Sequence, residues 1–230
     1  MLDSVKQMLK AMTPKRVIWM CIGVFLIGMS VSCSRLSGLG TDPFSCMNLG
    51  VSAVLRHVTN NGFFTYGNWQ LIVNLILLIP MIIWMRKGLG LGTIINMVFV
   101  GYVADFCMFI YKQFGIDTTT FADFMVVRVL LIVLALVLLT LGVALYMQCD
   151  LGIAPYDSLS PIMELKTNGK IKYAIGRVIT DCICVLIGFV SGSVVGVNTL
   201  IMMFGTGPFV TFFRTNVAAK VIPLENDNNK

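Results

Sequence analysis

Two residues of opposite charge stand four positions apart inside an otherwise uncharged, largely apolar segment near the end of the chain. They are Arg177 and Asp181, in the run YAIGRVITDCICVLIGFV. Residues at this spacing share one face of a helix, and charges inside an apolar span are rare and usually face a cavity or another helix. The pair therefore indicates substrate contact or a proton relay. An internal salt bridge, with Arg177 reaching towards the helix end, is the structural alternative, and the sequence leaves the two equally open.

A second candidate is a pair of short loops with the same pattern. Residues 38–43 read GLGTDP and residues 150–155 read DLGIAP, and in each a Leu-Gly pair precedes a proline that can open a helix. Glycine lets a ligand approach the backbone closely, and the free N–H groups at a helix start attract anions and carboxylates. The loops therefore predict a binding site at two helix N-termini, or else simple helix breaks that permit close packing.

The predicted site combines these loops with the charged pair. Asp42 is expected to cap the first short helix. Ala154 is a poor cap, so Asp157 in the first turn is expected to interact with the dipole of the second helix. Alignment of YGNWQLIVNL with YAIGRVITDC adds Asn74, which stands where the second half has Asp181. The predicted substrate-binding residues are Gly38, Gly40, Asp42, Pro43, Asn74, Gly152, Pro155, Asp157, Arg177 and Asp181.

Enzymatic chemistry is not expected from this sequence. The chain has one histidine, and it contains no Gly-x-x-x-x-Gly-Lys-Ser/Thr loop, no His-Glu-x-x-His and no Gly-x-Ser-x-Gly. None of its seven cysteines forms a Cys-x-x-Cys pair, so neither a metal site nor a cofactor is predicted. The net charge of +6 comes from basic residues beside apolar runs, which is typical of membrane topology signals rather than of nucleic-acid binding.

The elements that carry these residues are expected to be membrane helices. Hydrophobic residues make up 57% of the chain and charged residues 12%, against about 45–50% and about 25% in soluble domains. The helices predicted to start at Pro43 and Pro155 are too short to span a bilayer core, which needs about 20 residues. The expected fold is all-α and polytopic. Runs of near-spanning length lie near residues 17–33, 69–85, 89–111, 126–147, 173–190 and 194–213.

These elements form two similar halves, each with three long helices plus one short half-helix. Duplication of this kind is common in transporters. The clustering of Lys and Arg predicts that both termini are cytoplasmic. Arg56 and Lys166, at equivalent positions, favour parallel over inverted repeats. The predicted divisions are a basic N-terminus at 1–16, a first membrane repeat at 17–112, a linker at 113–126, a second membrane repeat at 127–214 and a polar tail at 215–230.

Five motifs in this order resemble one known family. They are GLGTDPFS, GLGTIIN, LGIAPYDSL, IGRVITD and GVNTLIMMFGTGP, and the chain is similar to the YczE/YyaS/YitT family of bacterial integral membrane proteins over about residues 15–214. The resemblance implies a multi-pass protein of the bacterial cytoplasmic membrane and says little about a substrate. The family pattern places an acid after the aromatic of the first loop, where this chain has Ser45, while Asp157 keeps the acid in the second loop.

Two hypotheses of function follow from these observations. The first is a small-solute transporter or permease subunit, whose site is formed by the two Gly-x-x-Pro loops and the Arg177 and Asp181 pair. The second is an accessory protein that scaffolds or regulates a membrane complex and uses the same glycines for helix packing. The expected partners are the lipid bilayer and an unknown small solute, with a homo-oligomer or a membrane partner protein left open.

Overall fold

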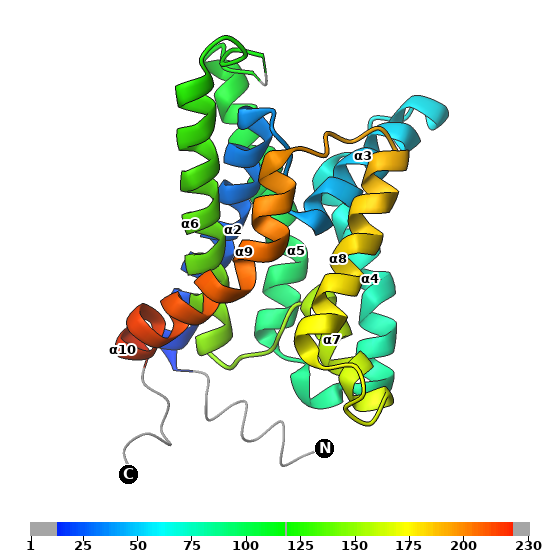
Figure 1. The fold of residues 1–230 in the computed structure, drawn as a ribbon, viewed down its shortest axis with the longest axis vertical. Helices are drawn as coiled ribbons and strands as arrows, with labels where there is room; N and C mark the ends of the chain where they lie inside the picture. The colour runs from blue at the N-terminus through cyan, green and yellow to red at the C-terminus, as the bar shows by residue number, and fades with distance from the viewer. Residues whose placement is uncertain (1–12, 118, 223–230) are drawn as a thin grey trace.

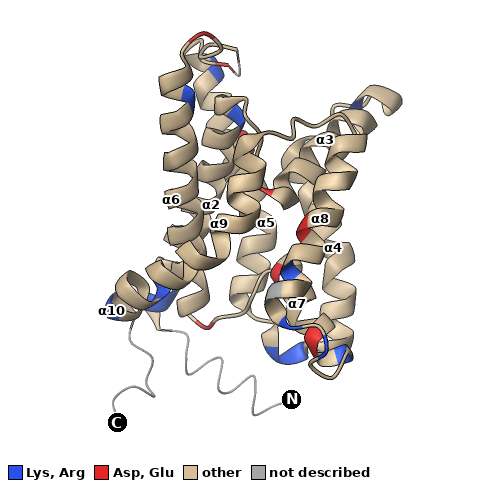
Figure 2. Ribbon diagram, viewed as in Figure 1, with Lys and Arg blue, Asp and Glu red and all other residues tan. Residues whose placement is uncertain are grey.

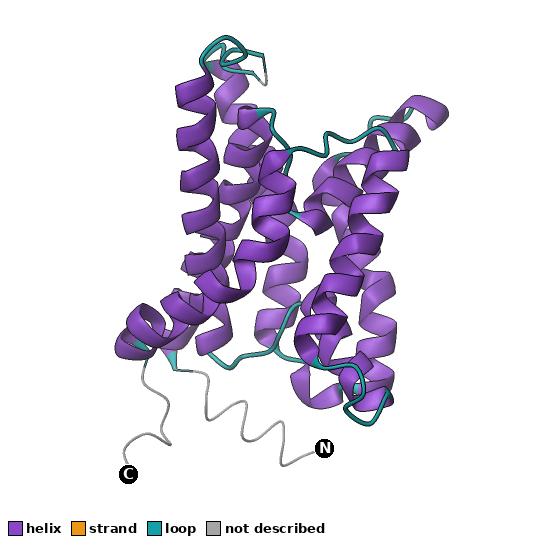
Figure 3. Ribbon diagram, in the orientation of Figure 1, coloured by secondary structure: helices purple, strands orange, loops and turns teal. Residues whose placement is uncertain are grey.

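The fold is seen in a computed structural model that describes residues 13–117 and 119–222. Within this part of the chain every regular element is a helix, joined by loops and turns (Figure 3). The predicted all-α fold is therefore confirmed. The main elements are α2 (Pro14–Ser37), α3 (Pro43–Thr59), α4 (Tyr66–Trp84), α5 (Leu91–Gln113), α6 (Met125–Gln148), α7 (Pro155–Lys166), α8 (Tyr173–Val190) and α9 (Val197–Phe213).

Three shorter elements complete the described chain. They are the 3-10 turn η1 (Arg86–Gly88), the π-helical segment η2 (Arg214–Ala218), which continues α9, and α10 (Ala219–Val221). Residues 1–12 of the predicted basic N-terminus and residues 223–230 of the predicted polar tail lie outside the described residues, whereas residues 215–221 of that tail are helical, in η2 and α10.

The six long runs predicted from sequence all form helices. Four of them, α2, α4, α5 and α6, are long and apolar enough to cross a membrane. The remaining two runs form α8, of 18 residues, and α9, of 17 residues, and these helices lie in the same bundle as the others (Figure 1). The protein is therefore a helical membrane protein by length, composition and packing of its helices.

The two half-length helices begin at the predicted prolines. At the start of α3, Asp42 accepts a hydrogen bond from the Ser45 backbone N–H at 3.0 Å, so the predicted cap is confirmed. Ala154 makes no side-chain cap at α7, and Asp157 lies in the first turn, as expected. Both helices start in the interior of the bundle, and α3 runs to its upper end whereas α7 runs to its lower end (Figure 1).

The prediction that the two halves run parallel is wrong. The first helices of the two halves, α2 and α6, pack antiparallel: Arg128 near the start of α6 donates to the Ser37 carbonyl at the end of α2, at 2.6 Å. Further along, Gly23 near the start of α2 lies against Gly142 near the end of α6, where an added Cβ would be 2.7 Å from the opposite carbonyl oxygen. The reason is that α3 and α7 return to the end from which they came instead of crossing.

The helices form two bundles that face one another (Figure 1). One contains α2, α5, α6 and α9, and its largest apolar cluster includes Met20, Leu139 and Met202. The other contains α3, α4, α7 and α8, with a smaller cluster around Phe44 and Tyr156. The two bundles are in close contact where α4 meets α5, since a Cβ at Gly101 would be 2.8 Å from the Gly67 Cα. This arrangement leaves the half-helix starts between the bundles.

Candidate functional site

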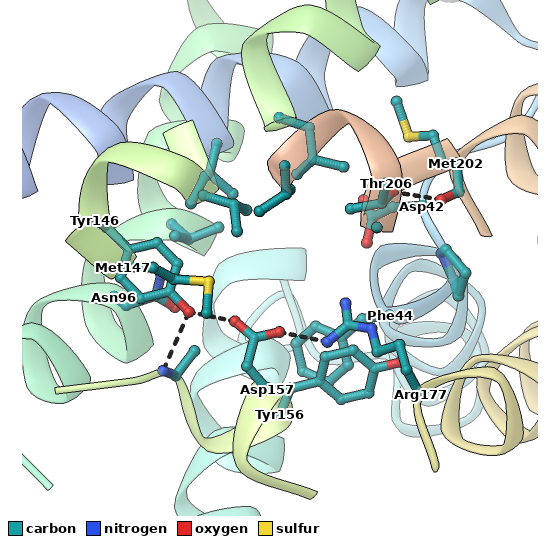
Figure 4. Close-up of a pocket in the computed structure, with 18 of the residues that line it drawn as sticks. Asp42, Phe44, Asn96, Tyr146, Met147, Tyr156, Asp157, Arg177, Met202 and Thr206 are labelled. Atoms are coloured by element: carbon teal, nitrogen blue, oxygen red, sulfur yellow. Dashed lines mark hydrogen bonds and ion pairs between the residues drawn. The ribbon is translucent and has the colours of Figure 1, made fainter. Parts of the chain in front are cut away.

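A cavity of about 730 Å³ lies between the two bundles. Its volume is in the range of about 300–1,000 Å³ that small-molecule sites occupy. Both half-helix starts contribute to its wall, and so does α8, as the close-up of the lining residues shows (Figure 4). Six of the ten predicted site residues line it, namely Asp42, Pro43, Asn74, Asp157, Arg177 and Asp181.

The charged centre of the cavity is one guanidinium held by two carboxylates. Arg177 Nη1 lies 2.5 Å from Asp157 Oδ1, and Arg177 Nε lies 3.5 Å from Asp181 Oδ1. Arg177 and Asp181 are thus a salt bridge along α8, as one of the two sequence interpretations held. Asp157 comes from α7, so the sequence pair is joined by a third charge from a different helix. Both carboxylates on this guanidinium belong to the protein, so an anionic ligand would have to compete with them for it.

Two tyrosines complete this centre, and the sequence reasoning missed both. Tyr146 of α6 donates its hydroxyl hydrogen bond to Asp157, and Tyr156 of α7 donates its own to Asp181. The Tyr156 ring also stacks on Phe44, with ring centroids 4.3 Å apart, and lies 4.7 Å below the Arg177 guanidinium carbon. The aromatic that follows the proline in each loop was a visible signal for this stack, whereas Tyr146 carried none.

Asp42 lies apart from this centre. It lines the cavity from the first loop, and Figure 4 shows it across the open space from the Asp157 and Arg177 pair. Among the described residues no Lys or Arg forms a salt bridge with it. Its one side-chain contact with the backbone is the cap on Ser45.

Three amide side chains line the cavity without hydrogen bonds of their own. Gln70, Asn74 and Asn96 are 3%, 2% and 8% exposed, and within the described chain their side chains have no hydrogen-bond partner. Buried polar groups are normally paired. Asn74 was predicted from the alignment with Asp181, while Gln70, one turn before it, was not. The Asn74 and Asn96 amides are available to a bound molecule or to water, whereas the Gln70 side-chain oxygen is buried against Gly101.

The loop glycines do not line the cavity, contrary to their predicted contact with a ligand. Gly40 has φ +99° and packs against the start of α9. Gly152 has φ +116°, and a Cβ there would be 2.7 Å from the Gly90 nitrogen at the start of α5. Gly38 ends α2 in the left-handed conformation, with φ 62°. Pro155 is buried at the first position of α7. These four residues shape the backbone, because the chain must pass very close to another helix there.

The loop carbonyls are tied to the opposite half of the chain. The Leu39 carbonyl accepts from the Asn198 backbone N–H at 3.1 Å, and the Leu151 carbonyl accepts from the Gly92 backbone N–H at 2.8 Å. Asn198 also donates its side-chain amide to the Gly40 carbonyl at 2.7 Å. Each loop is therefore fixed to the first turn of a long helix from the other half.

The lining of the cavity includes the exposed residues Thr211, at the end of α9, and Arg214 and Thr215, in η2. The fully buried Asn198 donates to the first loop. In the part of the chain that is described, no three His, Cys, Asp or Glu side chains are grouped to hold a metal ion.

Comparison with known proteins gives a family and three relatives. The family model described as a family of unknown function, DUF6198, matches residues 14–215. The uncharacterized protein YyaS of Bacillus subtilis is 26% identical over 180 residues, which is 78% of this chain and 83% of that protein. An uncharacterized protein of Haemophilus influenzae is 27% identical over 215 residues, covering 92% and 89% of the two chains.

The third relative is the uncharacterized membrane protein YczE of Bacillus subtilis, 25% identical over 148 residues and 64% of each chain. YyaS and YczE are the relatives expected from the loop motifs, so the predicted resemblance is confirmed. No solved structure matches this chain.

Proposed function

The chain belongs to the DUF6198 family, and we propose that it is a small-solute transporter or a permease subunit of the bacterial cytoplasmic membrane. One observation carries the proposal: a single cavity touches both half-helix starts and the Arg177 centre. Substrate sites of secondary transporters commonly lie between repeats at interrupted helices near the bilayer midplane. The cavity has that place in this molecule, between two bundles and next to two half-length helices.

The proposed architecture has six crossings and two re-entrant half-helices, in two inverted repeats. The antiparallel contact of α2 with α6 supports inversion. So does the exchange of loop contacts, in which residues 38–43 bind the start of α9 and residues 150–155 bind the start of α5. These two contacts are related to one another as the two halves of a duplicated unit would be.

The proposed orientation places the lower end of the view in the cytoplasm. Figure 2 shows that basic residues gather there more than at the upper end, and cytoplasmic loops carry an excess of Lys and Arg. Both described ends of the chain and the open side of the cavity would then face the cytoplasm, as expected for the termini from sequence. The elements at the lower end, namely the start of α2, η1, the end of α7 with the turn after it, η2 and α10, carry Lys15, Arg16, Arg86, Lys87, Lys166, Lys170, Lys172, Arg214 and Lys220. The elements at the upper end, namely the ends of α2, α3 and α5 and the start of α6, carry Arg35, Arg56, Lys112 and Arg128.

Transport in this scheme requires the two bundles to rock against each other. The described conformation is the one open to the cytoplasm, and the exchanged loop contacts close the outer side. Opening outwards would need the bond between Asn198 and the first loop to break. The close contact between Gly67 and Gly101 is a suitable pivot, because small residues let two helices pass closely without interlocking side chains.

The test is solute exchange by the purified full chain in proteoliposomes loaded with a cell extract and analysed by mass spectrometry. The variant Arg177→Gln/Asp157→Asn removes one charge of each sign from the centre, so its net charge is unchanged. We expect the wild type to exchange a solute and the variant to lose exchange. Arg56→Gln serves as the control, because the Arg56 guanidinium donates to the Phe64 carbonyl in an exposed loop and does not line the cavity. Exchange that is absent in the wild type, or unchanged in the variant, contradicts the proposal.

The accessory hypothesis has one specific observation in its favour. Four predicted site residues, Gly38, Gly40, Gly152 and Pro155, serve packing and do not line the cavity. A scaffold protein would need that packing and would not need the charged centre. Stable co-purification of a partner, with cellular function that survives Arg177→Ala and Asp181→Ala together, would favour this hypothesis over transport.

A further inference from the structure

We propose that the cavity binds an organic amine in its protonated form, with Asp42 as the counter-charge. This inference rests on the proposed transport function and names the class of solute. It follows from the balance of charge in the cavity, from unpaired acceptors in its wall and from the chemistry of the rest of the lining.

The charge balance of the cavity is negative. Its wall holds three carboxylates, Asp42, Asp157 and Asp181, and near them the single guanidinium of Arg177. Arg214 also lines the cavity, but at the exposed mouth, where it bonds Gln148. The wall therefore has two more acidic groups than basic groups near them, and the N-termini of α3 and α7 carry only about half a positive charge each.

The helix starts are already occupied by acids of this chain. Asp42 caps α3 and Asp157 lies in the first turn of α7, so each positive helix end has its own carboxylate. Arg177 is bound by both Asp157 and Asp181. An anionic solute would meet three carboxylates in this wall and one guanidinium that two of them already hold. The expectation from sequence that these helix starts attract an anion is therefore replaced by attraction for a cation.

The second, independent observation is the set of unpaired amides. Asn74 and Asn96 line the cavity, and among the described residues neither side chain has a hydrogen-bond partner. An amide oxygen accepts hydrogen bonds. A protonated primary amine has three N–H groups to donate to Asp42 and to other acceptors of the wall, whereas a quaternary ammonium has none.

The remaining lining fits an organic body better than a bare metal ion. Apolar side chains from three helices, including Ile27, Leu139 and Met202, form much of the wall. The loop carbonyls of Leu39 and Leu151, which could otherwise coordinate a sodium ion, accept backbone hydrogen bonds. Ligand pockets of this size are typically apolar with a few placed polar groups, which suits a hydrocarbon chain or ring that carries one ammonium.

The test measures the binding of four matched probes to the purified full chain, by the shift in thermal stability and by calorimetry. The probes are 2-phenylethylamine, phenyltrimethylammonium, 3-phenylpropionate and 2-phenylethanol. Each probe is measured twice, once in a choline buffer and once in a sodium buffer. We expect the amine to bind more tightly than the other three. Asp42→Asn should weaken amine binding about tenfold or more, because a charged hydrogen bond is lost. Asparagine is a good N-cap, so this variant keeps the start of α3.

Asp123→Asn is the control, since it makes the same chemical change at an exposed loop residue outside the cavity, and it should bind the amine as the wild type does. Preference for the propionate or the alcohol, or a sodium effect without an amine effect, overturns the inference. Equal amine binding by the wild type and by Asp42→Asn also overturns it. Each of these results leaves the transport proposal standing if proteoliposome exchange occurs, and absent exchange contradicts that proposal separately.

Discussion

The loops before α3 and α7 share their backbone contacts and differ in their charges. Each loop passes a glycine with positive φ against the start of a long helix, and each gives a leucine carbonyl to that helix. The first loop carries Asp42, which has no basic partner among the described residues. Behind the second loop, the first turn of α7 carries Asp157, which binds Arg177 and Tyr146.

This difference separates two tasks. The backbone of the loops fixes two half-length helices in place, and it does so alike in both halves because close helix contact requires glycine. The side chains behind the loops set the chemistry of the cavity, and there the halves diverge, with Ser45 at the position of Asp157 and Asn74 at the position of Asp181. The two halves therefore present one acid with a basic partner, Asp157, and one without such a partner among the described residues, Asp42, to the same cavity.

The largest effect is expected where the two loops are alike. Gly40→Ala and Gly152→Ala each force a Cβ onto the opposite helix at a positive φ, at 2.8 Å from the Gly196 nitrogen in the first case and 2.7 Å from the Gly90 nitrogen in the second. We expect each to cost about 4 kcal/mol, as strain and overlap add, and folded protein to be lost on size-exclusion chromatography. Gly62→Ala, with open space around it, should behave as the wild type. Tolerance of one substitution but not the other would show that the loops are not equivalent.

The next effect concerns the paired acid of the second loop. Arg177→Met leaves Asp157 and Asp181 without their cation, which should cost about 3 kcal/mol. Arg35→Met, which removes the partner of the single carboxylate Asp105 at similar exposure, should cost about 1 kcal/mol. Thermal unfolding in detergent measures both. Equal losses for the two variants would contradict the view that Arg177 holds two carboxylates, of which Asp181 is buried.

The third prediction introduces an acid at Ser45, the position in α3 that corresponds to Asp157 in α7. Ser45 is buried and its hydroxyl bonds the Tyr66 hydroxyl at 2.9 Å, so Ser45→Asp places a carboxylate beside Asp42 without a basic partner. We expect a loss of about 2 kcal/mol in the free energy of unfolding. Ser45→Asn is the control, because asparagine has the size of aspartate but no charge. A similar loss for both variants would mean that the size of the side chain, and not its charge, causes the loss.

The smallest effect concerns the helix caps. Asp42→Ala should destabilise the protein by about 1 kcal/mol, because the Ser45 N–H loses its acceptor. Ala154→Ser gives α7 the cap that it lacks and should stabilise it by about 0.5 kcal/mol. Both are read from thermal unfolding of the purified protein. A stabilising Asp42→Ala would instead indicate that repulsion between the acids exceeds the value of the cap.

The sequence was sufficient for the local features of the site. It placed the starts of α3 and α7, the cap by Asp42 and the helix pair of Arg177 and Asp181, since proline, capping residues and four-residue spacing act within a few positions of the chain. It failed for the direction of the repeats, because basic residues at equivalent positions carry no information once the half-helices re-enter from opposite ends. Tyr146 was missed because its contact with Asp157 depends on a turn of the chain that no local pattern specifies.

The amino-acid sequence by itself determined that the chain is a helical membrane protein with two interrupted segments, because apolar length and proline or glycine breaks are properties of short stretches. Only the tertiary structure decided which residues face the cavity. Gly40 and Gly152 turned out to touch helices from the other half, and Asp157 turned out to share Arg177 with Asp181. Those outcomes depend on contacts between residues far apart in the chain, and they arise when two bundles pack and leave their polar side chains to meet between them.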